Sequence, residues 1–274
     1  MRPVRLTRQV TFSSGHRYWF EHLPEAENRA LFGPWASPFN HGHNYVLEAT
    51  VEGTVDPVTG MVVNIKTIDD LLDERIVAQF DQKSLNDQVP HFRSHAPTVE
   101  NILLYVRDTL GALPEGTKLV GLRLFETPLL WGDLIKNGND WTMTFTRAYE
   151  FAASHRLHNP DLPDAKNIEL YGKCNNPAGH GHNYVVEVSV EGEVDPKTGM
   201  MVDMLALDAA IKDLVAEKYD HKNLDIDLPE FAGKVTTSEV IVEEIWKALD
   251  GKLPAKLAKV KLFETPRSSF EVSR

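Results

Sequence analysis

The chain has 274 residues, 42% of them hydrophobic and 25% charged, so it is long enough for two globular domains of about 100–150 residues each. Its 29 Lys and Arg residues against 40 Asp and Glu residues give a formal net charge of -11, which argues against a general binder of nucleic acids or membrane surfaces. The sequence begins without the apolar stretch of a signal peptide and contains no run of roughly 18 apolar residues, so we expect a cytoplasmic protein.

The chain repeats itself. A shift of 139 residues superimposes Phe12 on Phe151, His16 on His155, His41 on His180, His43 on His182, Asp81 on Asp220 and Glu100 on Glu239. After a one-residue deletion, Leu124–Pro128 and Leu262–Pro266 carry the same five residues, LFETP. We therefore predict two tandem domains, residues 1–137 and 138–274, which meet in a polar, turn-rich segment.

Both copies show the same order of predicted elements. A first strand ends at His16 or His155, and a second runs over 41–51 or 180–190 with near-strict alternation of apolar residues. An Asp-Pro-x-Thr-Gly turn follows. Two helices are then predicted from apolar positions at helical spacing: Ile68, Leu71, Leu72, Ile76 and Ile102, Val106, Leu110 in copy one, and Leu207, Ala210, Ile211, Val215 and Ile241, Ile245, Leu249 in copy two. The order ββααββ predicts an α+β fold, an antiparallel sheet with both helices on one face.

Three histidines in each copy have the pattern of a metal site. His180 and His182 are two residues apart in a strand, so both imidazoles point to one face, and His155 ends the preceding strand. Three histidines without a cysteine or carboxylate beside them are typical of a zinc site with an open fourth position. One isolated His-x-His pair is usually an ordinary hydrogen-bonded pair. Here the pair and its upstream histidine recur together at identical spacing, which favours metal binding.

The copies differ where acid–base chemistry needs a titratable group. Cys174 lies in a loop six residues before the His-x-His pair, and Asp220 precedes His221 as a carboxylate–imidazole pair able to relay a proton. Each has a structural alternative, since a lone cysteine is often inert and the Asp-His sequence can simply end a helix. Copy one has Trp35 and Gln82 at the positions of that cysteine and histidine. Only copy two is therefore expected to transfer protons.

Two glutamates complete each copy. Glu239 follows Thr236 in the pattern of a helix capping box, although copy one keeps Glu100 without the corresponding threonine. Glu264 and Glu126 lie at the end of an apolar strand. A carboxylate there is either exposed at the rim or directed at paired N–H groups of a ligand.

The motifs of copy two, "YGKCNNPAGHGHNY", "YDHKNLDIDLPEFA" and "KLFET", together resemble the 6-pyruvoyl-tetrahydropterin synthase family along almost the whole copy, and copy one resembles it more distantly. The resemblance implies the tunnelling fold, whose subunits assemble into barrels. It also implies a zinc-dependent carbon–oxygen lyase of tetrahydrobiopterin biosynthesis, which converts 7,8-dihydroneopterin triphosphate to 6-pyruvoyl-tetrahydropterin and triphosphate. Copy one would be catalytically degenerate. A homotrimer of two-domain chains, a pseudo-hexamer, is expected.

Carried over by motif position, the resemblance implies a role for each site residue. The zinc ligands would be His155, His180 and His182, with a second, non-catalytic set in His16, His41 and His43. The catalytic residues would be Cys174, Asp220, His221 and Glu264. The substrate would be bound by Glu239, Thr237, Arg156, Lys173 and Lys222, with Mg²⁺ able to accompany its triphosphate.

Other functions fit parts of the pattern. A 6-carboxy-tetrahydropterin synthase of deazaguanine biosynthesis takes the same substrate, although its cysteine usually lies closer to the His-x-His pair than Cys174 does. A non-catalytic pterin- or metal-binding protein would need neither that cysteine nor His221. A three-histidine hydrolase would need an acid–base glutamate near the ligands, and a cupin would need Glu187 on the same strand face as the histidines, whereas its parity is opposite.

Overall fold

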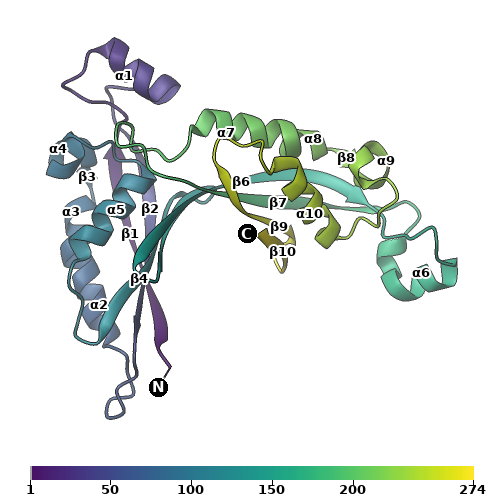
Figure 1. The fold of residues 1–274 in the computed structure, drawn as a ribbon, viewed down its shortest axis with the longest axis horizontal. Coiled ribbons are helices and arrows are strands. Elements are labelled where there is room, and N and C mark those ends of the chain that lie inside the picture. Colours follow the sequence, from purple (N-terminus) through teal and green to yellow (C-terminus); the bar gives the residue numbers. More distant parts are fainter. Residues whose placement is uncertain (1) are drawn as a thin grey trace. The chain divides into compact units, whose positions relative to one another are not determined.

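The computed structural model describes residues 2–274 and is shown in Figure 1. The chain forms two compact units. Unit 1 contains the residues up to Phe145 together with Gly192–Met201, and unit 2 contains Thr146–Glu191 and Val202–Arg274. A short segment of the second repeat therefore belongs to the unit that is built from the first repeat.

The sheet of unit 1 is mainly antiparallel. β1 (Val4–His16) pairs with β2 (His41–Gly53), β2 with β4 (Thr117–Thr127), and β4 with β5 (Leu130–Asn137). The other edge of β5 adjoins the start of β6 (Asp140–His155). Alternate residues of β2, from Tyr45 to Val51, are buried, as the sequence predicts for a strand with one face in the core.

The helices of unit 1 are α1 (Glu25–Phe32), α2 (Ile65–Leu72), α3 (Ala78–Phe80), α4 (Leu85–Gln88) and α5 (Val99–Leu110), with the shorter segments η1 (Gly33–Trp35), η2 (Asp73–Val77), β3 (Lys83–Ser84) and η3 (Pro90–Arg93). α2, α3 and α5 lie along one face of the sheet, whereas α1 lies beyond the ends of the strands (Figure 1). Of the predicted apolar positions, Ile68, Leu72 and those of α5 are buried, Ile76 is buried in η2, and Leu71 is partly exposed. β3 adds two residues in parallel to the end of β1.

Unit 2 repeats this arrangement. β7 (His180–Glu191) lies between β6 and β9 (Lys256–Thr265), and β10 (Ser268–Ser273) pairs with β9. β8 (Lys222–Asn223) pairs in parallel with the end of β6. The helical segments are α6 (Asp164–Tyr171), η4 (Gly172–Asn175), α7 (Met204–Ile211), η5 (Lys212–Ala216), α8 (Glu217–Tyr219), α9 (Leu224–Asp227), η6 (Pro229–Phe231) and α10 (Ser238–Leu249).

The predicted fold class is confirmed: each unit is α+β, with an antiparallel ββααββ framework and two long helices on the sheet. The predicted capping box is wrong. The N-cap of α10 is Thr237, whose side chain accepts a hydrogen bond from the Val240 N–H, while the Thr236 hydroxyl donates to Asp225 at 2.7 Å. The helix therefore starts one residue later than the pattern suggested, because Asp225 engages the earlier threonine.

The short helices α1 and α6 were not predicted, since their apolar faces are weak. Within residues 2–274, the structure has no helix that combines the length and the apolar character needed to cross a membrane.

Candidate active site

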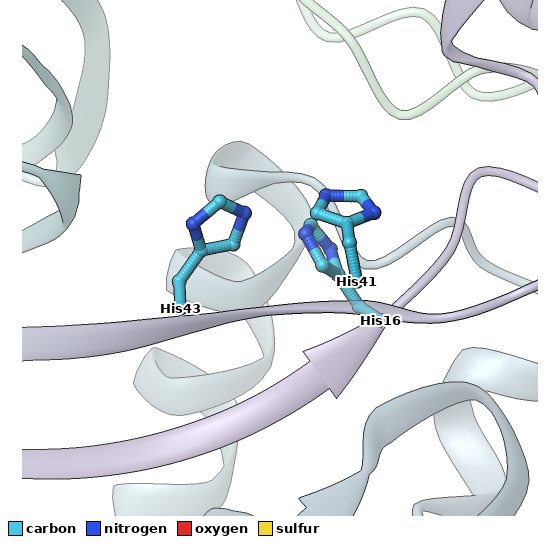
Figure 2. Close-up of side chains that lie close together, drawn as sticks. All are labelled: His16, His41 and His43. Atoms are coloured by element: carbon cyan, nitrogen blue, oxygen red, sulfur yellow. The ribbon is translucent and has the colours of Figure 1, made fainter.

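The first histidine cluster forms where β1 and β2 pair. His16 lies directly opposite His41 in the register, and His43 follows two residues later on the same strand face. Figure 2 shows the three side chains close together, with ring centroids 4.3 Å apart for His16 and His41 and 5.1 Å apart for His16 and His43. One ligand nitrogen from each residue lies within 4.8 Å of the others. Strand register alone thus gathers this triad.

The first cluster is held ready for a cation. The Nδ1 of His16 lies 2.9 Å from the Pro97 carbonyl, to which it must donate, so the Nε2 lone pair is left free. The Nε2 atoms of His16 and His43 are buried and make no hydrogen bond within residues 2–274. Burial, reinforced by His41, lowers the pKa of His16 to about 3 and that of His43 to about 4. Neutral imidazoles with unshared lone pairs fit a zinc ion.

The second cluster has the same construction. His155 is buried at the end of β6, and its Nδ1 lies 2.7 Å from the Thr236 carbonyl. Its Nε2 is 3.2 Å from the Nε2 of His180. Two ligands of a tetrahedral zinc ion, each about 2.0–2.1 Å from the metal, are separated by about 3.3 Å, so this spacing fits. Burial lowers the pKa of both His155 and His182, which keeps the imidazoles neutral.

A glutamate borders each triad. An Oε1 of Glu264 is 3.9 Å from His155 Nε2 and 3.7 Å from His182 Nε2. The hydroxyl of Ser238 donates to the same oxygen at 2.9 Å. Glu126 has the equivalent position in copy one, 3.7 Å from His43 Nε2. Ser238 was not among the predicted site residues. It is Val99 in copy one, so only the second glutamate has this serine as a donor.

The Asp220–His221 pair is oriented by the fold. One carboxylate oxygen of Asp220 accepts from the Ala152 N–H at 2.7 Å, and the other lies 2.7 Å from His221 Nδ1. The hydrogen bond from the Ala152 N–H is the main cause that lowers the pKa of Asp220, and the hydrogen bond with His221 is the second. The Nδ1–H of His221 therefore points at the carboxylate, and its Nε2 remains available on a side chain that is 84% exposed.

The same turn exists in copy one. Gln82 has φ +55° and His221 φ +56°, both in the left-handed region. The N–H of Gln82 donates to Ser13, and the N–H of His221 donates to Ala152. The backbone of this turn is thus a property of the fold, and the imidazole is an addition of copy two.

Cys174 lies in η4, immediately before the loop that leads into β7. Its side chain is partly buried, and its carbonyl accepts from the Leu157 N–H at 3.0 Å. It is the one cysteine of the sequence, and its thiol is free of any disulfide. Trp35, at the equivalent position of η1, is 42% exposed.

Two cavities lie near the second cluster. One of about 450 Å³ is lined by His182, His221 and Lys222, which brings together one residue from each predicted group. Another, of about 380 Å³, is lined by Arg156 and by Lys234, which was not among the predicted site residues. Of the other predicted substrate residues, Lys173, Thr237 and Glu239 line neither cavity. Glu239 is exposed on the first turn of α10.

Neighbouring residues hold both the side chain and the backbone of Arg156. Its Nε donates to Asn175 Oδ1 at 3.1 Å, and its backbone N–H donates to Asp225 at 2.6 Å. Asn175 ends η4 and Asp225 lies in α9, and no local pattern in the sequence indicated that these two residues lie close together.

Comparison with known proteins agrees with the predicted resemblance. The family model described as 6-pyruvoyl tetrahydropterin synthase matches residues 5–135 and again residues 144–274. The 6-pyruvoyl tetrahydrobiopterin synthase of Homo sapiens is 48% identical over 121 residues, which cover 44% of this chain and 83% of that protein. The 6-carboxy-5,6,7,8-tetrahydropterin synthase of Rickettsia conorii is 25% identical over 143 residues, which cover 46% of this chain and 95% of that protein.

Among solved structures, the 6-pyruvoyl tetrahydropterin synthase of Caenorhabditis elegans aligns with a TM-score of 0.46 at 42% identity, covering 48% of this chain and 96% of its own. The two family matches confirm the tandem duplication that the repeat predicts. Since they extend over almost the whole chain, the chain belongs to the 6-pyruvoyl tetrahydropterin synthase family.

Proposed function

We propose that this chain is a lyase that converts 7,8-dihydroneopterin triphosphate to 6-pyruvoyl-tetrahydropterin and inorganic triphosphate. The observation that carries the proposal is the second copy, in which a three-histidine cluster is accompanied by Cys174 and an oriented Asp220–His221 pair. The 48% identity to the human 6-pyruvoyl tetrahydrobiopterin synthase supports the same activity.

We propose that the metal is zinc, held by the imidazoles of His155, His180 and His182. When bound, it would act as a Lewis acid toward the hydroxyl groups of the substrate side chain and acidify the neighbouring C–H bonds. Mg²⁺ is proposed only as a companion of the substrate triphosphate.

The proton transfers are assigned to the chain's own residues. Cys174, as a thiolate, takes a proton from a side-chain carbon of the substrate. His221 shuttles protons through its free Nε2, because Asp220 holds the Nδ1–H. Glu264, held by Ser238, relays a proton or accepts from the pterin N–H groups. Triphosphate departs while the side chain rearranges by internal redox, so the reaction needs no external oxidant.

Substrate binding is assigned to residues around this centre. We propose that Arg156, Lys173 and Lys222 neutralise the triphosphate, and that Thr237 and Glu239 border the pterin end of the pocket. Lys222 has the strongest structural support, since it shares a cavity with His182 and His221.

Copy one is proposed to bind metal without catalysis. It has the complete triad of His16, His41 and His43, but Trp35 and Gln82 replace the two proton-transfer residues. We propose domain limits of 1–137 and 138–274 and a homotrimer of two-domain chains, a pseudo-hexamer in which neighbouring sheets complete barrels.

The proposal is tested by incubating the zinc-loaded protein with 7,8-dihydroneopterin triphosphate and identifying the products. Triphosphate with a pyruvoyl pterin is the expected result. Acetaldehyde with a carboxy pterin would assign the chain to the 6-carboxy-tetrahydropterin reaction, and absence of turnover would assign it to a non-catalytic binder. Cys174→Ala is the negative control, and Trp35→Ala is the matched variant of copy one that should retain activity.

A further inference from the structure

The two histidine triads differ in the residues that hold their first histidine. In unit 2, the Thr236 carbonyl accepts from His155 Nδ1 at 2.7 Å, and the Thr236 hydroxyl donates to Asp225 at 2.7 Å. The other carboxylate oxygen of Asp225 accepts from the backbone N–H of Arg156 at 2.6 Å. Because Arg156 follows His155 in the chain, these three hydrogen bonds form a closed ring that begins and ends at the histidine.

The equivalent residues of unit 1 do not close such a ring. Asn86 stands at the position of Asp225, and Pro97 stands at the position of Thr236. The Asn86 side chain accepts from the Arg17 N–H at 2.9 Å and donates to the Arg17 carbonyl at 3.0 Å. The Pro97 carbonyl still faces His16 Nδ1 at 2.9 Å, but the proline side chain has no polar atom to offer Asn86.

The two exchanges between the copies are chemically coupled. An asparagine can supply both an acceptor and a donor to one backbone residue, whereas a carboxylate has acceptors alone and needs a second donor. Thr236 supplies that donor to Asp225 from a fully buried side chain, 0% exposed. An unpaired polar atom at such a place would be costly, so the carboxylate and the hydroxyl belong together.

The ring in unit 2 constrains a metal ligand from two sides. The carboxylate of Asp225 holds the backbone next to His155 and also holds the residue whose carbonyl accepts from its ring. A metal-binding imidazole is oriented by the hydrogen bond of its second nitrogen, and the groups that fix this partner influence how tightly the metal is bound. The ring therefore directs the His155 Nε2 before a cation is bound, so less ordering accompanies binding.

We propose that Asp225 and Thr236 are positioning residues for His155, and that they give the metal site of unit 2 a higher zinc affinity than that of unit 1. This inference rests on the proposed zinc binding by both triads and deepens it, because it ranks the two sites. Outer partners of metal ligands typically change metal affinity about ten- to a hundredfold. The copy that keeps the proton-transfer residues is thus also the copy that holds its metal more firmly.

The first part of the test compares the two sites in the full chain. His43→Ala leaves the complete triad of unit 2, and His182→Ala leaves the complete triad of unit 1. Competition with a chromophoric chelator then gives the zinc dissociation constant of each site separately. We expect the constant of unit 2 to be about ten- to a hundredfold lower. Equal constants, or a lower constant in unit 1, would overturn the proposal.

The second part breaks the ring within the His43→Ala chain. Asp225→Asn leaves one oxygen for two donors, and Thr236→Val removes the hydroxyl while keeping the carbonyl that faces His155. Each should raise the zinc dissociation constant about ten- to a hundredfold. Since both variants open the same ring, the double variant should bind zinc no more weakly than the weaker single variant. Unchanged constants in both single variants would overturn the proposal.

The controls separate positioning from packing. Thr236→Ser keeps the hydroxyl and should restore the wild-type constant, whereas zinc binding as weak as in Thr236→Val would assign Thr236 to packing alone. Asn86→Asp, placed in the His182→Ala chain, is the matched change of unit 1 and should not tighten zinc binding, because Pro97 offers no hydroxyl.

Two further readouts distinguish the possible failures. The melting temperature of each metal-free variant reports folding, and if Asp225→Asn did not fold, the comparison of Thr236→Val with Thr236→Ser would decide the proposal. Absence of zinc binding in both the His43→Ala and the His182→Ala chains would refute the proposed metal sites themselves. Zinc binding with constants that none of the ring variants changes would refute this inference alone.

Discussion

The two histidine clusters have nearly the same backbone, and three of the side chains that differ around them bear on proton transfer. Each has a triad across the first two strands, a Glu at 3.7 Å and a left-handed residue in the adjacent turn. The differences are Trp35 for Cys174, Gln82 for His221 and Val99 for Ser238. The comparison indicates that strand register builds the metal site, while a few side chains on that frame decide whether protons are transferred. The following experiments test this division.

Removing one ligand from each triad should give the largest contrast. His182→Ala is expected to lose the zinc of unit 2 and reduce turnover at least about a thousandfold, since metal and orientation are lost together. His43→Ala should lose the zinc of unit 1 and keep near-wild-type turnover. Zinc analysis with product formation measures both. Loss of turnover in the folded His43→Ala variant would contradict a non-catalytic role for copy one.

Converting His221 to the residue of copy one should give the next largest effect. His221→Gln is expected to lower kcat about a hundred- to a thousandfold, the range for a general acid–base group, without lowering the melting temperature. The fold tolerates glutamine in this left-handed turn, because Gln82 adopts the same φ in copy one. The reverse change, Gln82→His, should leave kcat unchanged. A retained kcat in His221→Gln would remove the imidazole from the mechanism.

Converting Ser238 to valine should have a smaller effect. The change removes the 2.9 Å hydrogen bond to Glu264, which we expect to lower kcat/KM about five- to tenfold through poorer positioning of that carboxylate. Val99→Ser is the matched change beside Glu126 and should not alter turnover. If Ser238→Val changed only the melting temperature, the serine would serve packing alone.

The smallest effect concerns stability of the metal-free protein at acid pH. Burial holds the pKa of His16 near 3 in the folded state against a usual value of 6.5, so the unfolded chain takes up the proton first as the pH falls. The resulting loss of stability starts near pH 6.5, continues toward pH 3, and is at most about 1.4 kcal/mol per pH unit for one group. The free energy of unfolding, measured with urea at pH 7 and at pH 5, should fall less between these two pH values in His16→Gln than in the wild type. An equal change of the free energy of unfolding with pH in both proteins would mean that His16 is not the titrating group.

Much of the site could be predicted, because the internal repeat and the strand period are both visible in the sequence without any knowledge of tertiary contacts. His180 and His182 share a face by strand period alone, and the comparison of Cys174 with Trp35 required only alignment of the two copies. The assignment of the N-cap to Thr236 failed because Asp225, which lies eleven residues away, engages that hydroxyl. Short-range pattern reading has no information about such a partner.

The sequence by itself determined the duplication, the α+β order of elements, the two metal-ligand sets and the loss of proton-transfer residues in copy one. These follow from periodicity and residue type. Only the tertiary structure decided that Ser238 holds Glu264 beside the triad, that Asp220 fixes one nitrogen of His221, and that Glu100 receives the backbone of a turn about a hundred residues away. Such hydrogen bonds form only when residues that are distant in the sequence lie close together in space. The packing of the helices on the sheet determines which residues do so.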